Sequence, residues 1–114
     1  MQKIITEKIG DKLIVLLQGD VNAADVRLSR RLQPPRAAPL ECHLWIDCAS
    51  IQCVKTHGFC HFINQLLLLK SPQVKITLLN MSPLHQKLLQ AMHLTSFFSV
   101  LPDFEEAYHM VQAC

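Results

Sequence analysis

An uninterrupted apolar run near the N-terminus constrains the fold more than any other feature of this sequence. Residues 13–17 are Leu-Ile-Val-Leu-Leu, and Gly10-Asp11 lies one residue before them. A run this short, preceded by a turn, predicts a β-strand that is buried on both faces. The β-prone residues 3–9 come before the turn, so Gly10-Asp11 predicts a two-residue hairpin with antiparallel strands. A strand buried on both faces belongs to a sheet that helices cover.

Strand-like and helix-like segments alternate along the rest of the chain. The prolines at 34, 35 and 39 make residues 33–39 a loop. The remaining patterns predict strands at 43–48, 74–79 and 97–101, and helices at 21–32, 56–70, 83–93 and from Asp103 onward. This order predicts an α/β fold in one domain, residues 1–114. Its sheet is mixed and mostly parallel, with about five strands and about four helices.

The composition excludes several classes of protein. Half of the residues are hydrophobic and 18% are charged, whereas disordered chains are poor in hydrophobic residues and rich in charge. The net charge of +2 is too small for a typical nucleic-acid-binding domain, and the four arginines between residues 27 and 36 are typical of a solvated helix face and loop. No apolar run approaches the roughly 18 residues that a membrane span needs.

The cysteines indicate a reducing compartment. Five occur, and no two of them have the spacing of a redox-active Cys-x-x-Cys pair. The N-terminal residues lack the charged and apolar regions of a secretory signal peptide. We therefore expect a cytoplasmic protein with reduced thiols.

The segment between residues 46 and 58 carries the candidate functional residues. A buried strand should end at Asp47, and a loop then leads to the helix whose first turn contains Thr56, His57 and Gly58. Thr56 is the expected N-cap of that helix, where its hydroxyl would accept a backbone N–H. A phosphate added there would meet the unpaired N–H groups of the helix start. Glycine inside a helix costs about 1 kcal/mol relative to alanine, so Gly58 is either tolerated or allows a close approach.

Two other readings of these residues remain open. Asp47 could cap neighbouring backbone N–H groups, or it could be a lone polar group at the rim of a nucleotide-sized cleft. His57 and His61 are four residues apart with Cys53 and Cys60 nearby, a spacing that can hold a metal ion. The chain has no Gly-rich phosphate loop, paired catalytic carboxylates or Ser-His-Asp order. We therefore expect no enzyme activity and no cofactor.

The chain as a whole resembles the STAS domain, the sulphate transporter and anti-sigma factor antagonist module. Three features carry the resemblance: the order of elements, the central strand–loop–helix, and segments at Gly19-Asp20-Val21-Asn22, Ile76–Asn80, Leu88-Leu89 and Phe104–Ala107. Asp47 and Gly58 fall at the spacing of the family's central motif. On that register Thr56 takes the place of the phosphorylated serine, Lys55 that of the preceding aspartate, and His57 that of a second serine.

The resemblance implies a regulatory protein that binds another protein. Antagonists of this family bind an anti-sigma factor that is also a serine/threonine kinase, and phosphorylation at the helix start breaks the complex. It implies a partner-binding surface at Asp47, Lys55, Thr56, His57 and Gly58. Lys55 reverses the charge of the family's acid, so it either pairs with a phosphate on Thr56 or spoils recognition by the kinase. In the second case the domain is a constitutive adaptor, as STAS-like subunits of lipid-transport complexes are.

The apolar residues that the predicted elements do not bury also lie near Thr56. They are Val54, Phe59 and the Met81–Leu84 turn, all close to the expected ends of the parallel strands. We expect these side chains to contribute to the same partner-binding surface.

Overall fold

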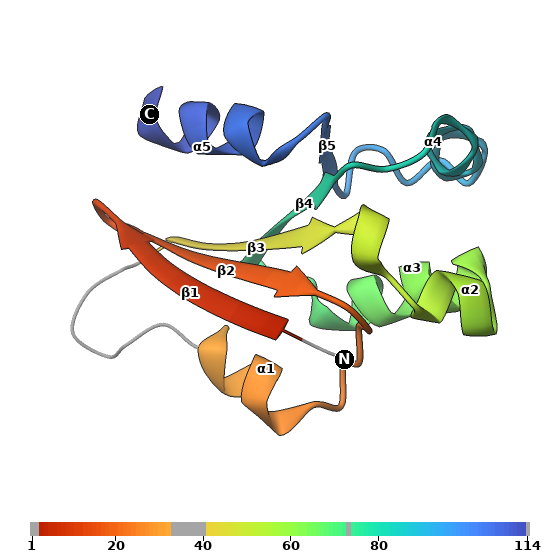
Figure 1. Cartoon of the computed structure of the whole chain (residues 1–114), viewed down its shortest axis with the longest axis horizontal. Coiled ribbons are helices and arrows are strands. Elements are labelled where there is room, and N and C mark those ends of the chain that lie inside the picture. Colours follow the sequence, from red (N-terminus) through yellow and green to blue (C-terminus); the bar gives the residue numbers. More distant parts are fainter. Residues whose placement is uncertain (1–2, 33–40, 73, 114) are drawn as a thin grey trace.

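A five-stranded sheet with helices on both faces forms the fold (Figure 1). The structure, a computed structural model, describes residues 3–32, 41–72 and 74–113. The strands lie side by side in chain order: β1 (Lys3–Ile9), β2 (Lys12–Gln18), β3 (Glu41–Asp47), β4 (Val74–Leu79) and β5 (Ser99–Leu101). The β1–β2 hairpin is antiparallel, and each later strand is parallel to its neighbour. The predicted mixed, mostly parallel α/β sheet is confirmed, while the expected loop at 33–39 lies outside the described residues.

The apolar run of β2 is buried on both faces of the sheet, as predicted. Successive side chains of a strand point to opposite faces, and Ile14, Val15 and Leu17 are all at most 3% exposed. In the parallel register, Ile14 is opposite His43 of β3 and Leu17 is opposite Ile46. On each face of the sheet, the side chains of β2 and β3 therefore form an apolar layer that helices can cover.

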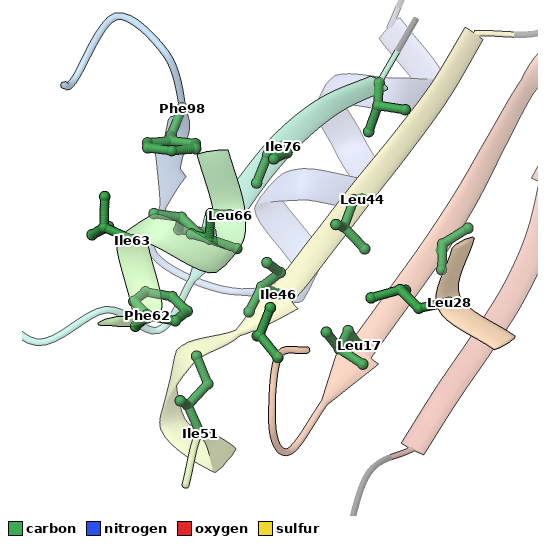
Figure 2. Close-up of a cluster of buried hydrophobic side chains, with 14 of the residues drawn as sticks. Leu17, Leu28, Leu44, Ile46, Ile51, Phe62, Ile63, Leu66, Ile76 and Phe98 are labelled. Carbon is green, nitrogen blue, oxygen red and sulfur yellow. The ribbon is translucent and has the colours of Figure 1, made fainter. Parts of the chain in front are cut away.

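The helices divide between the two faces. In Figure 1, α1 (Val26–Arg31) and α3 (Phe59–Leu69) lie below the sheet, and α5 (Phe104–Ala113) lies above it. The lower face holds the larger core cluster, shown in Figure 2, which includes Leu17, Leu28, Leu44, Ile46, Phe62, Ile63, Leu66 and Ile76. The smaller cluster under α5 consists of Ile14, Trp45, Leu79, Ala107 and Val111. Each face thus has a core of its own.

Several predicted limits are wrong; the strand expected at 97–101, for example, is only β5 (Ser99–Leu101). The helix expected at 21–32 begins only at Val26, because the Asp25 side chain caps it by accepting the Arg27 N–H. The helix expected at 56–70 is two helices, α2 (Cys53–His57) and α3 (Phe59–Leu69), which makes five α-helices in the described residues. A 3-10 turn, η1 (Cys48–Ser50), follows β3, and α4 (Pro83–Ala91) ends two residues earlier than expected.

Gly58 separates α2 from α3 through its backbone conformation. Its φ of 91° and ψ of 169° lie in a region that is essentially restricted to glycine. A Cβ atom at this position would meet no other atom within 4 Å. Contrary to expectation, Gly58 therefore does not lie inside a helix, and no atom of the described residues approaches it closely; it turns the chain between two helices.

Replacement of Gly58 by alanine should destabilise the fold through backbone strain alone. We expect Gly58→Ala to lower the free energy of unfolding by about 1–3 kcal/mol, measured by urea denaturation. Cys60→Ala, at an exposed position on α3, is the control and should change it by less than about 0.5 kcal/mol. Equal stability of the two variants would contradict the assigned conformation.

Charged side chains gather at one end of the face under α5. Lys12, 8% exposed, donates from Nζ to the carbonyl oxygen of Val111 at 3.1 Å and so ties β2 to the end of α5. Glu41 forms an ion pair with Lys75, and its Oε2 lies 3.4 Å from Nε2 of His43. Lys75, and then His43, hold the pKa of Glu41 below its ordinary value. Burial lowers the pKa of His43, which outweighs the opposite effect of Glu41.

The lowered pKa of His43 should make the fold less stable in mild acid. The unfolded chain binds a proton at this residue as the pH falls below about 6.5, whereas the folded chain resists it. Between pH 7.5 and 5.5 the free energy of unfolding should therefore fall, and by less in His43→Gln. The His109 side chain is 69% exposed, so His109→Gln should lose as much free energy of unfolding over this pH range as the unmodified chain. The same loss in His43→Gln as in the unmodified chain would assign the effect to other groups.

The depressed pKa of Glu41 adds stability that is lost below about pH 4.5.

Candidate functional site

A pocket of about 320 Å³ lies where the chain leaves β2 and passes over α2 and α3. It is lined by two separate stretches of sequence, whose members are Asp20, Val21, Asn22, Thr56, His57, His61 and Gln65. The first stretch follows the end of β2, and the second runs from α2 into α3. We call this pocket the Thr56 pocket.

The segment after β2 is held against α3 by specific contacts. Gly19 has a φ of 103°, which turns the chain at the end of β2, and Val21 is 3% exposed in the main core. The side-chain oxygen of Gln65 accepts the Ala23 N–H at 2.8 Å. Because these contacts join two elements far apart in sequence, the pocket has a fixed wall opposite Thr56.

Thr56 is exposed but does not cap the long helix. It lies in the last turn of α2, and its N–H donates to the carbonyl oxygen of Gln52 at 2.9 Å. Gly58, not Thr56, is the N-cap residue of α3. The expected N-cap role of Thr56 is therefore wrong, because the chain coils from Cys53 and then breaks at Gly58. A phosphate on Thr56 would stand at the end of a short helix instead of at the first residue of α3.

Two histidines line the pocket beside Thr56. The ring centres of His57 and His61 are 4.7 Å apart, with the ring planes inclined by 49°. Lys55 is exposed on α2 and does not line the pocket. Across the described residues, no group of three or more His, Cys, Asp or Glu side chains is placed to hold a metal ion. The two imidazole rings can instead donate or accept hydrogen bonds in the wall of the pocket.

Asp47 acts as a structural link at the end of β3. Its carboxylate accepts hydrogen bonds from Gln18 Nε2 (3.2 Å), Ala49 N (3.1 Å), Ser50 Oγ (3.3 Å) and Asn80 Nδ2 (3.2 Å). These donors belong to β2, to η1 and to the residue after β4. Asp47 is not part of the Thr56 pocket. Of its two expected roles, the structure shows the capping one.

Gln65 is the pocket residue that sequence reasoning missed. It lies four residues after His61, so both side chains project from one face of α3. Two polar residues at four-residue spacing on a mostly apolar helix were the available signal. The contact of Gln65 with Ala23, however, depends on the position of a distant loop.

Of the apolar residues expected to be exposed near Thr56, Leu84 is exposed, Val54 and Phe59 are partly buried against the core, and Met81 is buried. Met81 is 6% exposed and belongs to the core. Leu84, Leu88 and Met92 are 64%, 39% and 38% exposed and follow one another at four-residue intervals, which places them on one side of the helix. We call them the α4 stripe. Next to Leu84, His85 stacks on Phe59 at a ring distance of 4.9 Å, so α4 adjoins the start of α3.

Solved structures of similar fold exist at low sequence identity. The NMR structure of the protein TM1081 matches with a TM-score of 0.52 and 12% identity, over 94% of this chain and 86% of that one. The unphosphorylated anti-sigma factor antagonist SpoIIAA matches with a TM-score of 0.48 and 14% identity, over 98% of both chains. No family model matches the chain, and no curated protein matches it significantly. The likeness to TM1081 shows a shared fold.

Among the described residues, no helix is both long enough and apolar enough to cross a membrane.

Removal of the Asp47 carboxylate should loosen the ends of three strands. Asp47→Ala leaves four donors without their acceptor, and we expect the free energy of unfolding to fall by about 1–3 kcal/mol. Glu105→Ala serves as the control because that side chain is 84% exposed on α5; it should cost less than about 0.5 kcal/mol. Denaturant titration of both variants measures the difference, and a neutral Asp47→Ala would refute the structural role.

Proposed function

We propose that this chain is a regulatory protein-binding module of the STAS type, controlled by phosphorylation of Thr56. One observation carries the proposal. Two of the segments by which the sequence resembles antagonists of this family, Gly19–Asn22 and Lys55–Gly58, lie more than 30 residues apart in the chain. Residues of both segments line the same pocket, with the exposed Thr56 in its wall.

The charges around Thr56 supply a physical basis for a switch. A phosphate would add a charge of about −1.5 to −2 at pH 7. That charge would stand in the same pocket as the Asp20 carboxylate and the imidazoles of His57 and His61, close in sequence to Lys55. A partner that binds the unphosphorylated pocket would then have to remove water from a dianion, which weakens the complex.

The α4 stripe supports a protein partner rather than a small ligand at this surface. Because His85 stacks on Phe59, α4 and its exposed Leu84 lie beside the start of α3. Many protein interfaces have an apolar centre and a polar rim, and the α4 stripe would form such a centre. The resemblance names the partner class: an anti-sigma factor that is also a serine/threonine kinase, in the cytoplasm, controlling transcription.

A second candidate is an adaptor of the same fold that is never phosphorylated. Lys55 favours the adaptor. In the resembled antagonists the residue before the phosphorylated one is acidic, and Lys55 gives that position the opposite charge. In this case the α4 stripe would hold a permanent partner, and a charge at Thr56 would have no regulatory meaning.

The two candidates differ in how binding responds to charge at Thr56. The tagged chain and its variants Thr56→Glu, Thr56→Val and Thr95→Glu are compared as baits for the partner kinase. Under the proposal the chain, Thr56→Val and Thr95→Glu retain the partner, whereas Thr56→Glu retains at least tenfold less. Thr95 is the matched control because it is also an exposed threonine.

Phosphorylation itself is measured by intact mass after incubation with that kinase and ATP. We expect a gain of one phosphoryl group in the unmodified chain and in Thr95→Val, and no gain in Thr56→Val. Equal retention of the partner by all baits, with no mass gain, would replace the switch with the adaptor.

A further inference from the structure

The outer side of β1 is an open edge of the sheet. β1 is the first strand in the sheet order, so β2 pairs with only one of its two sides. In an antiparallel pair, every second residue of a strand directs its N–H and C=O groups away from the neighbouring strand. Among the described residues, no strand bonds to the groups on the outer side of β1. An open edge of this kind can accept a further strand from another protein.

The two faces of the sheet differ at this edge. Ile4 packs against the main core, so its side chain points to the face that α1 and α3 cover. Because side chains alternate along a strand, Ile5 points to the other face, where its side chain is 41% exposed. An apolar side chain on an added strand would cover Ile5 in a cross-strand pair.

Three arginines of α1 lie next to the edge on the opposite face from Ile5. Arg27, Arg30 and Arg31 line a pocket of about 320 Å³ together with Ile4, and Figure 1 shows α1 below β1. Nη1 of Arg31 donates to Oγ1 of Thr6 at 2.7 Å, so the cations extend to the strand itself. All three arginines are exposed, and Asp25 forms an ion pair with Arg27. Three arginines against one aspartate leave this face of the edge positively charged.

This positive charge discriminates between the strands that could add to β1. A second copy of the chain, paired symmetrically through β1, would bring its own α1 arginines to the same face, where like charges repel. A segment with a carboxylate at every second position would instead place its acidic side chains beside α1. Guanidinium groups pair well with carboxylates, because their donors match the two carboxylate oxygens.

We infer that the outer edge of β1 binds an extended acidic segment of another protein as an additional strand. Its backbone bonds to the outward N–H and C=O groups of β1. Its carboxylates face Arg27, Arg30 and Arg31, and the apolar side chains between them cover Ile5. No residue that lines the arginine pocket also lines the Thr56 pocket, so this inference and the proposed function can fail separately.

Synthetic peptides test the site on the full chain. The probe is a fluorescein-labelled peptide of alternating valine and glutamate, about eight residues long, and its binding is followed by fluorescence anisotropy at low ionic strength. The controls are a peptide of the same composition with the valines and glutamates in two blocks, an alternating valine–lysine peptide, and a single-stranded RNA of equal charge. We expect saturable binding of the probe and at least tenfold weaker binding of all three controls. No saturable binding of the probe, or equal or tighter binding of any control, would overturn the inference.

Methylation of the peptide backbone tests whether the probe binds as a strand. Successive N–H groups of a strand point to opposite sides, so only one alternate set can face β1. One version of the probe is methylated at the valine amides and another at the glutamate amides. We expect one version to bind at least tenfold more weakly than the other. Equal affinity of the two versions would contradict strand addition.

The arginine contact is tested with a matched pair of variants. Arg30→Gln removes one charge beside β1 and should weaken binding of the probe about threefold, the effect of one exposed ion pair. Lys87→Gln removes the same charge from an exposed position on α4 and should leave the affinity unchanged. Equal affinities of these two variants would refute the contact between the acidic segment and α1.

Discussion

The double-sided burial of β2 and β3 is the constraint on which the rest of this structure depends. Because both faces of these strands are apolar, the sheet needs a helical layer on each side, and the chain supplies α1 and α3 for one face and α5 for the other. The two helical layers are attached to the sheet by different kinds of contact. The α3 side is held by a large apolar cluster, whereas α5 combines a small cluster with the buried Lys12–Val111 contact. The Thr56 pocket and the pocket beneath α5 both result from this arrangement, since each forms where a helical layer meets one end of the strands.

The two ends of the sheet thus have separate chemistry. At the carboxyl ends of the parallel strands, Asp47 joins three strands while the neighbouring surface stays open. This is the edge at which binding sites gather in open α/β sheets, and Thr56, His57 and His61 lie there. At the amino ends, charged side chains are drawn under α5 and are satisfied mainly by one another.

Local patterns predicted the strands well because burial on both faces leaves an unmistakable apolar run, as in residues 13–17. The same patterns failed at Gly58, since the apolar spacing of Phe59, Phe62 and Ile63 continues smoothly from the residues before it and carries no sign of a break. The segment after β3 contributes Thr56 and His57 to a pocket, but the role of Asp47 depends on Gln18 and Asn80, which only the strand register brings close. The pocket beneath α5 could not be predicted for the same reason, because Lys12, Glu41 and Lys75 come from three different strands.

The position of α5 in the chain has a consequence for biosynthesis. A ribosome releases all five strands before residues 104–113 emerge, so a nascent sheet can pair its strands while one of its faces still lacks a cover. During that interval the side chains of Ile14, Trp45 and Leu79, which α5 later buries, are open to water and to other nascent chains. Exposed apolar surface of this kind makes partly folded proteins prone to aggregation. Chaperones that bind apolar segments would therefore have their greatest effect on this protein just before its last helix is complete.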